Sequence, residues 1–524
     1  MTKYLLKRIL HGIISVVIVV AIVMFMVYTA MDRTLIFATD PLYTKQMNNQ
    51  KESYKYRRWK EFGYLDYVPY SDYLLELQRN GEIDEKTRVE AARLGKTEDK
   101  DNATAKKYIA QFKEKYETGS GYKFVRLDTV MQGKKIGQGG QAQCFVYKET
   151  PLISRLFNYF GNLVQIDNIN RAKEVKGERK LSFTLYDPLY GGEKFSPAIM
   201  GNGTEHKYLL YFDNKFPYIH QNLITINLGT SYSVKQGQDV FITMTQSQGS
   251  YIKSTLTYPA TGHVEESADD LHTATYVKGS LDISASNQVR FDDDYTSVLT
   301  VNSGMSKLGY SFVIGILEVI LSYFLGVPLG IIMARKKDKL IDKLGTLYIV
   351  FIIAVPSLAY IFMFKAIGGQ LGLPTTFNMD SKNKLMYVLP IISLALPAIA
   401  SLMKWLRRYM IDQMNSDYVK FARSGGLSDS EIFSKHILKN AIIPLVHDIP
   451  ASILFAMTGA IITERVYVVP GAGNLLTEAI NKYDNGVIIG VTLFYALLSV
   501  TAVIVGDVLM SLVDPRISFS SKAR

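Results

Sequence analysis

The chain has 524 residues, 48% hydrophobic and 20% charged, with a net charge of +11. This length allows several domains, and the composition alone does not exclude a soluble enzyme. The single cysteine, Cys144, excludes an intrachain disulfide. Residues 1–31 and 308–513 are dominated by apolar runs, whereas 32–305 are polar and rich in tyrosine. Basic residues stand beside the apolar runs, so the positive charge indicates membrane topology rather than nucleic-acid binding.

The first apolar run covers residues 13–31, contains no charge, and follows Lys3, Lys7 and Arg8. A secretory signal peptide is the alternative. The run is longer than the apolar core of a signal peptide, and no clear small-x-small cleavage site follows it. Its length matches the ~20 residues that a bilayer requires, so we expect a retained transmembrane helix.

Five further spans are expected in the C-terminal part of the chain. They cover residues 308–334, 344–367, 385–406, 444–463 and 486–510. Several contain proline, which membrane helices tolerate when neighbouring helices satisfy the freed backbone groups. We therefore expect these helices to pack together as a bundle.

Basic residues beside the spans set their orientation. The four clusters are Lys3, Lys7 and Arg8; Arg335, Lys336, Lys337, Lys339 and Lys343; Arg407, Arg408, Lys420, Arg423, Lys435 and Lys439; and Arg516, Lys522 and Arg524. Six spans put all four clusters in the cytoplasm, whereas an odd number does not. Both termini are then cytoplasmic, and residues 32–305 are extracellular.

The segment 32–305 is expected to form a mixed α/β domain, mainly antiparallel. Residues 71–118 contain charged amphipathic stretches that are typical of short helices. Later, short alternating runs separated by Pro, Gly, Asn and Asp predict strands. These runs are 181–186, 207–212, 240–245, 251–257 and 280–287. The glycine-rich stretch 136–142 imitates a kinase loop but lacks its third glycine, so we expect a turn before a strand.

The loop after the fourth span carries the most specific local pattern. Ser428 and Glu431 have the spacing of an S-x-x-E capping box. Leu427 and Ile432 stand at the two positions of a hydrophobic staple. The pattern predicts a helix that begins sharply at Ser428.

Gly425 and Gly426 precede this helix and supply a tight turn. The helix is expected to end near Asn440, just before Pro444 begins the next span. A short, capped helix on a membrane loop suits docking into another protein. An amphipathic helix lying on the membrane surface is the alternative.

This loop resembles a known motif. Residues 417–427 read DYVKFARSGGL, which is similar to the EAA loop of ABC-importer permeases in its oligopeptide/dipeptide/nickel variant. Four other segments match the family in order: YLLKRIL at 4–10, LGTSY at 228–232, TERVYVVPGAGNL at 463–475 and VDPR at 513–516. Ala479, Ile480 and Asp484 continue the third of these, and Asp507 belongs to the fourth. The resemblance extends over about half the chain, and the order of the five segments makes it specific.

The sequence also departs from the family pattern. Lys420 and Phe421 stand where the general loop has acidic and alanine residues, and Met510 replaces a tyrosine. The segment between the first two spans is much longer than usual. That expansion resembles the B-type oligopeptide-permease subunits of streptococci and related Gram-positive bacteria.

The resemblance implies a membrane all-α six-helix permease bundle of the ABC importer type I, with a large extracellular mixed α/β, mainly antiparallel, inserted domain. The implied parts are an N-terminal transmembrane helix at 1–31, the extracellular domain at 32–305, a five-helix core at 306–513 with the coupling loop 407–443, and a cytoplasmic tail at 514–524. The implied location is a bacterial cell membrane, in contact with lipid.

The family also implies partners: a second homologous permease subunit in a heterodimer, two cytosolic ATPase subunits, and an extracellular peptide-binding lipoprotein. The chain has no G-x-x-x-x-G-K-[ST] loop, so ATP and Mg²⁺ are expected on the ATPases and no cofactor on this chain. No nucleic-acid partner is expected. The expected function is the pore-forming subunit of an ATP-driven oligopeptide importer. A dipeptide or nickel importer, or a membrane-anchored receptor or scaffold, is the alternative.

A permease subunit breaks no covalent bond, so no catalytic residue is expected, and the absence of a dense His/Cys cluster predicts no metal site. The expected ATPase-coupling residues are Ala422, Gly425, Gly426, Leu427, Ser428, Glu431, Ile432 and Phe433. Ionisable groups within a membrane are functional candidates because their burial is costly. The pore or gate candidates are Glu318, Glu464, Pro470, Gly471 and Asp507. For Glu318 a helix–helix hydrogen bond is favoured over a contact with the peptide, and for Glu464 and Asp507 packing or gating is expected.

Overall fold

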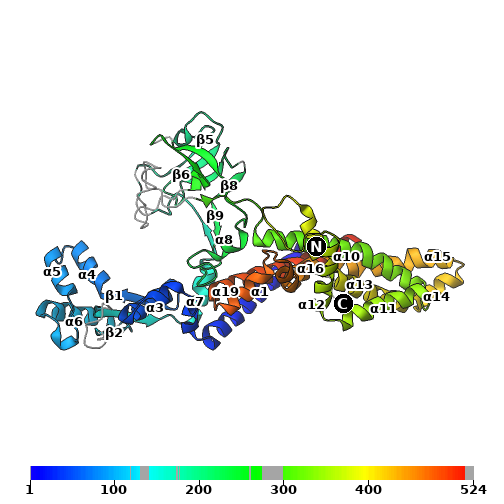
Figure 1. The fold of residues 1–524 in the computed structure, drawn as a ribbon, viewed down its shortest axis with the longest axis horizontal. Coiled ribbons are helices and arrows are strands. Elements are labelled where there is room, and N and C mark those ends of the chain that lie inside the picture. The colour runs from blue at the N-terminus through cyan, green and yellow to red at the C-terminus, as the bar shows by residue number, and fades with distance from the viewer. Residues whose placement is uncertain are drawn as a thin grey trace.

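The computed structural model describes residues 2–118, 120–129, 141–172, 175, 177–216, 218–258, 261–273 and 299–513. A bundle of long helices occupies one part of the molecule, and two smaller lobes extend from it (Figure 1). The lobe with α3–α6 lies at one end of the long axis, and α14 and α15 lie at the other. Residues 514–524, including the predicted cytoplasmic tail, lie outside the described residues.

Five described helices are long and apolar enough to cross a membrane. They belong to α1 (Thr2–Ala30), α10 (Lys307–Arg335), α13 (Val388–Met414) with the preceding η5 (Lys384–Tyr387), α16 (Lys439–Gly459) and α19 (Asn485–Val513). A sixth span is present if the bent pair α11 (Leu340–Ala354) and α12 (Ser357–Gln370) counts as one.

The span predicted at 344–367 is bent rather than straight. Helices α11 and α12 meet at an angle of 109°. Proline disfavours the α conformation of the residue before it. Val355 accordingly has φ −86° and ψ 129°, and Pro356 takes the N-cap position of α12. The apolar run therefore continues across a sharp bend in the backbone.

Helices α10 and α13 run in the same direction. A Cβ on Gly326 would lie 3.0 Å from Leu402 Cβ, and one on Gly330 would lie 3.2 Å from Leu406 Cβ, so the contacts advance together along both helices. The chain between them returns from one end of the bundle to the other. Asp342, near the start of α11, pairs with the guanidinium of Arg407 at 2.7 Å.

The end of the returning segment lies at the opposite end of α13. Gly368, near the end of α12, packs against Leu389 in the first turn of α13. Helix α1 packs antiparallel to α19, since Gly12 contacts Val500 while Tyr4 reaches Asp507. The starts of α1 and α16 and the end of α19 thus meet at one end of the bundle.

The first lobe, residues 33–149, combines short helices with a three-stranded antiparallel sheet of order β1-β3-β2. Its elements are η1 (Arg33–Phe37), α2 (Pro41–Lys45), α3 (Asn48–Glu61), β1 (Leu65–Pro69), α4 (Tyr70–Arg79), α5 (Glu85–Ala92), η2 (Glu98–Lys100), α6 (Ala103–Glu117), β2 (Lys123–Leu127) and β3 (Gln143–Glu149). Helices predicted in 71–118 are confirmed as α4, α5 and α6. The glycine-rich stretch 136–142 lies mostly outside the described residues.

The second lobe, from residue 164 to 301, is built on a four-stranded antiparallel sheet of order β5-β6-β7-β8. After α7 (Leu152–Gly161), the elements are β4 (Val164–Ile166), β5 (Lys180–Thr184), η3 (Pro188–Tyr190), β6 (Ala198–Asn202), β7 (Tyr208–Phe212), β8 (Ile219–Gln221), β9 (Ile224–Ile226), α8 (Val240–Thr245), β10 (Ser254–Tyr258), β11 (His263–Ser267), β12 (Asp269–Asp270), η4 (Leu271–Thr273) and β13 (Leu299–Thr300). The strands predicted near 181–186, 207–212 and 251–257 are confirmed as β5, β7 and β10.

The strand predicted at 240–245 is wrong, because these residues form helix α8. The Asp239 carboxylate caps it by accepting hydrogen bonds from the backbone N–H groups of Phe241 and Ile242. Val240 and Met244, four positions apart, are both buried on one face of the helix. The strand predicted at 280–287 lies outside the described residues.

Candidate functional site

The turn that is predicted to contact the ATPases, here termed the coupling turn (residues 423–431), lies at the end of the bundle opposite the first lobe (Figure 1). Helix α14 (Asp417–Ser424) ends at Gly425, which has φ −76°. Gly426 has φ +85°, a left-handed conformation that strains any residue with a Cβ. A Cβ at Gly426 would meet nothing within 4 Å, so backbone conformation rather than space requires glycine there.

The predicted capping box is confirmed at the start of α15 (Asp429–Glu431). The backbone N–H of Glu431 donates to Ser428 Oγ at 3.3 Å, and the backbone N–H of Ser428 donates to Glu431 Oε2 at 3.2 Å. Leu427 and Ile432 pack in the same apolar cluster, as a hydrophobic staple requires. The turn therefore has a defined shape without help from a partner.

The prediction that this helix ends near Asn440 is wrong. It continues through η6, a π-helical segment (Ile432–Leu438), directly into α16, so Pro444 lies inside a helix. The buried residues explain this continuity, since they recur every four positions across the predicted break. They are Phe433, Ile437, Ala441 and Leu445.

The predicted coupling residues divide into two groups. Ala422, Ile432 and Phe433 are buried against the chain's own helices. Gly425, Gly426 and Ser428 are exposed, while Leu427 and Glu431 are partly covered. Phe421 is 80% exposed, although it is a large aromatic side chain. In the sequence Phe421 was noted only as a departure from the family pattern. Its position among polar, charged and small residues at 420–426 could have indicated an exposed aromatic side chain.

Glu318 lines a cavity of about 440 Å³ among α10, α13 and α16. Its carboxylate accepts a 2.6 Å hydrogen bond from Ser322. Tyr323, Asp448 and Ser452 add further polar groups to the wall. Among the predicted pore or gate residues, Glu318 is the one that borders this cavity.

Glu464, Pro470 and Gly471 form a packed corner instead. Helix α17 (Ile461–Tyr467) places the Glu464 carboxylate where it accepts hydrogen bonds from Ser311 Oγ at 2.7 Å and from the backbone N–H of Asn474 at 3.1 Å. A Cβ on Gly471 would overlap that carboxylate. The half-buried Pro470 leads into the turn before α18 (Gly473–Asn481).

Asp507 joins three helices at one end of the bundle. It accepts a 3.0 Å hydrogen bond from the Tyr4 hydroxyl and lies 3.1 Å from Arg8 Nε. His447 Nε2, on α16, lies 3.4 Å from its other oxygen. These contacts give Asp507 a role in helix packing.

Residues 326–519 match the family described as "Binding-protein-dependent transport system inner membrane component". The chain is 33% identical over 530 residues to the oligopeptide transport system permease protein AmiC of Streptococcus pneumoniae, covering 100% of this chain and 99% of AmiC. The chain belongs to this permease family. It is a multi-pass membrane protein and a non-catalytic subunit of the transport system.

Other relatives of this permease match less of it. The dipeptide permease DppB of Lactococcus lactis is 30% identical over 229 residues, which covers 43% of this chain and 73% of DppB. The oligopeptide permease AppB of Bacillus subtilis is 28% identical over 226 residues, or 41% of this chain. The full-length match to AmiC therefore includes the long segment between α1 and α10.

The permease joins that segment to the bundle at Asp484, just before α19. The buried Asp484 carboxylate accepts hydrogen bonds from Ser231 Oγ at 2.6 Å and from the backbone N–H groups of Tyr232, Ser233 and Val234 at 2.8–2.9 Å. A Cβ on Gly486 would overlap the backbone of Thr230. Both ends of this contact lie in segments that resemble the family, but their pairing was not predicted.

Proposed function

We propose that this permease is the pore-forming subunit of an ATP-driven importer of oligopeptides. The observation that carries the proposal is the coupling turn, a preshaped and exposed structure on a chain that is similar over its full length to an oligopeptide permease. Partner ATPases use ATP and Mg²⁺, and this chain converts their movement into a change of the bundle.

The turn is suited to this coupling because one side is anchored and the other is free. Ile432 and Phe433 pack against α10 and α13, so a push on the turn moves the helices around the cavity. Phe421 and the glycines remain available to an ATPase groove. Two bundle arrangements with different affinity for the ATP-bound partner suffice for alternating access.

The peptide path is proposed to run along the Glu318 cavity, between this chain and a second homologous permease. Phe455 lines this cavity and is 72% exposed, where a partner subunit or lipid covers it. Asp448 and Glu318 give the wall acidic groups that attract the amino terminus or basic side chains of a peptide. A dipeptide importer remains the alternative, since DppB is among the relatives.

Six crossings with both termini in the cytoplasm are proposed, and the parallel course of α10 and α13 supports them. Cysteine labelling tests this topology in a Cys144→Ser background, where each new cysteine is the single one. Cysteine at Lys60 or Glu178 should react with an impermeant reagent in intact cells. Cysteine at Lys337 or Ser430 should react after the cells are opened; the reverse pattern would contradict the topology.

The two lobes are proposed to dock the peptide-binding lipoprotein outside the cell. One face of the β5–β8 sheet supports this role, because Phe183, Ile199 and Leu210 are opposite one another on adjacent strands. Phe183 is 66% exposed and Leu210 is 42% exposed. A modest interface suffices when the partner is tethered to the same membrane. A passive cover over the pore mouth is the alternative role.

Reconstitution tests the proposed function as a whole. Vesicles containing both permeases and the ATPases have a lumen that corresponds to the cytoplasm. They should take up a labelled hexapeptide when ATP is enclosed in the lumen and the lipoprotein is added outside. Preference for a dipeptide over the hexapeptide would favour the alternative substrate. ATP hydrolysis without uptake of either peptide would contradict the importer assignment.

A further inference from the structure

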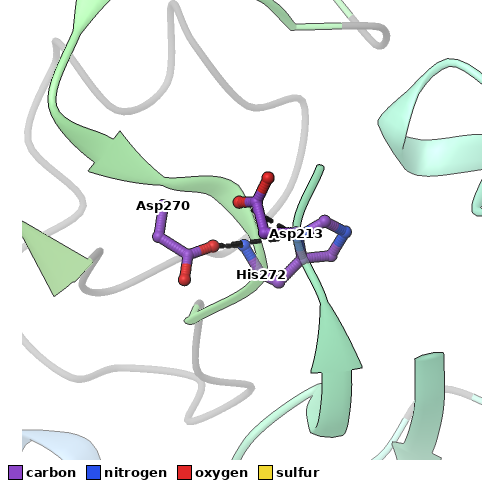
Figure 2. A group of neighbouring side chains, drawn as sticks. All are labelled: Asp213, Asp270 and His272. Carbon is purple, nitrogen blue, oxygen red and sulfur yellow. Dashed lines mark hydrogen bonds and ion pairs between the residues drawn. The ribbon is translucent and has the colours of Figure 1, made fainter. Parts of the chain in front are cut away.

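A buried cluster in the second lobe gathers acidic and imidazole side chains from distant parts of the chain. Asp187 precedes η3, Asp213 follows β7, Asp270 ends β12 and His272 lies in η4. Figure 2 shows the carboxylates of Asp213 and Asp270 converging on the His272 ring. Each of these four residues is no more than 1% exposed. Three of them, Asp213, Asp270 and His272, each offer one ligand atom, and these three atoms lie within 4.8 Å of one another.

Several atoms of this cluster make no hydrogen bond within the described structure. They include Asp213 Oδ2 and His272 Nδ1, together with Nε2 of the neighbouring His220, whose Nδ1 lies 3.1 Å from Asp270 Oδ2. A buried polar atom without a partner costs about 1–3 kcal/mol, so such a group points to a ligand that satisfies it. His272 Nδ1 lies 3.7 Å from Asp213 Oδ2 and 3.7 Å from Asp270 Oδ1. These distances are too long for hydrogen bonds.

The same distances fit two ligands on one ion. Two atoms that each lie about 2.1 Å from a tetrahedral metal are separated by about 3.4 Å. The His272–Asp213 and His272–Asp270 separations are therefore within a few tenths of an ångström of those expected around one ion. One nitrogen and two carboxylate oxygens form a donor set suited to Zn²⁺ or Mn²⁺ rather than to an all-oxygen ion such as Ca²⁺.

Neighbouring groups hold the candidate ligands in position. The backbone N–H of Lys215 and the hydroxyl of Tyr190 donate to Asp213 Oδ1 at 2.8 and 3.1 Å, which leaves Oδ2 directed at His272. The Tyr211 hydroxyl donates to Asp270 Oδ2 at 3.0 Å.

Behind the imidazole, Asp187 Oδ2 lies 3.3 Å from His272 Nε2. This is the arrangement of a carboxylate–histidine–metal triad, in which a second carboxylate orients the ligating ring.

Charge also favours a cation. The cluster holds three buried carboxylates, Asp187, Asp213 and Asp270, and two buried imidazoles, His220 and His272. With ionised carboxylates, the five side chains carry −3 + 2 = −1 even when both imidazoles are protonated. Buried charge is costly unless it is paired or coordinated to a metal.

We propose that Asp213, Asp270 and His272 bind one divalent transition-metal ion, Zn²⁺ or Mn²⁺, which holds the second lobe together. The apolar clusters of this lobe are small. Within the described residues, one contains Leu256, Tyr258 and Leu271, and the other contains Ala198, Tyr208 and Tyr211. The cluster touches both through Leu271 and Tyr211. A structural ion contributes stability where a small apolar core does not suffice.

The competing arrangement is a metal-free ion pair. Burial lowers the pKa of His272, but the carboxylates of Asp187, Asp213 and Asp270 raise it to about 10. An imidazolium at His272 would then balance part of the negative charge. The 3.7 Å separations also lie within the range of ion pairs, so the two arrangements differ in whether the cluster takes up a metal ion.

The test uses the full chain, purified in detergent and stripped with EDTA. Zn²⁺ or Mn²⁺ should bind with one equivalent per chain and raise the unfolding temperature. Bound Co²⁺ should give visible d–d bands from nitrogen and oxygen ligands. Asp213→Asn and His272→Gln should abolish the bands, and Tyr190→Phe should weaken binding roughly 10–100-fold.

His206→Gln is the matched control, since His206 pairs with Asp167 in the same lobe outside the cluster; this variant should bind like the native chain. The native chain decides the matter even if the cluster variants fail to fold. Binding of less than one equivalent, stabilisation by Ca²⁺ alone, or equal loss in His206→Gln would overturn the proposal.

Discussion

Asp484 accepts a 2.6 Å hydrogen bond from the hydroxyl of Ser231, which stands 253 positions earlier in the chain. Around this bond the Asp484 carboxylate also accepts from three successive backbone N–H groups. A motion of α19 is therefore transmitted directly to the segment that carries the second lobe. The same contact lies close to the first lobe, because Asn485 donates to the Tyr64 hydroxyl.

Asp484→Ala should loosen both lobes from the bundle. Hydrogen bonds to a charged acceptor contribute about 1.5–3 kcal/mol each, and their donors would remain buried, so we expect a loss of about 3–5 kcal/mol in unfolding free energy. Thermal unfolding and limited proteolysis of the lobes measure it. Glu478→Gln removes a nearby, more exposed pair with Lys482 and should cost under about 1 kcal/mol. Equal effects of the two changes would contradict the anchoring role.

Gly426→Val should impair coupling while the protein remains in the membrane. The left-handed backbone of Gly426 would be strained by about 1–3 kcal/mol with a branched side chain. Peptide uptake and peptide-stimulated ATP hydrolysis, measured at equal membrane levels, report the effect. Gly425→Ala should have the smaller effect, since Gly425 has an ordinary φ of −76° and its backbone is not strained by a Cβ. Normal uptake by Gly426→Val would argue against the importance of this turn.

Phe421→Ala should weaken assembly with the ATPases without destabilising the permease. An exposed aromatic that becomes buried in a partner groove contributes about 2 kcal/mol or more, which corresponds to about 30-fold in affinity. Co-purification and titration with ATPase measure this loss. The unfolding temperature should stay constant because Phe421 is 80% exposed. Lys420→Ala, at the adjacent exposed position, should reduce the affinity for the ATPases less than Phe421→Ala does. A greater loss in Lys420→Ala than in Phe421→Ala would contradict the placement of Phe421 in the interface.

Gly471→Ala should destabilise the corner around Glu464, because the new Cβ overlaps the carboxylate. Glu464→Ala should also destabilise it, since the buried hydroxyl of Ser311 loses its acceptor. In the double variant the overlap disappears, so the two losses should not add. We expect an interaction of about 1–3 kcal/mol in unfolding free energy. Additive losses would mean that Glu464 and Gly471 act independently.

Local patterns in the sequence predicted local structure well. The capping box at Ser428 involves residues three positions apart, so spacing alone identifies it. The bend at Pro356 was missed because the residues on both sides are apolar, and hydropathy does not register backbone direction. The helix at 240–245 was missed for a similar reason: its β-branched residues favour a strand, while the Asp239 cap and burial of Val240 and Met244 decide for a helix.

Contacts between distant segments could not be predicted in this way. Asp484 and Ser231 were both noted in family-like segments, yet nothing in their spacing joins them. Asp213, Asp270 and His272 come from separate strands and turns, so they form no ligand pattern in the sequence. The burial of Ala422 and the exposure of Phe421 likewise depend on where α10 and α13 pass.

The long separation of Asp484 from Ser231 sets an order of events during synthesis. At roughly 5–20 residues per second, ribosomes need on the order of 10–50 s to reach Asp484 after making Ser231. During that interval the lobes fold before Asp484, the residue that attaches them to the bundle, has been synthesised. Their closure onto the bundle is therefore a late step in biogenesis, and premature termination before α19 would leave exported lobes that quality-control proteases can reach.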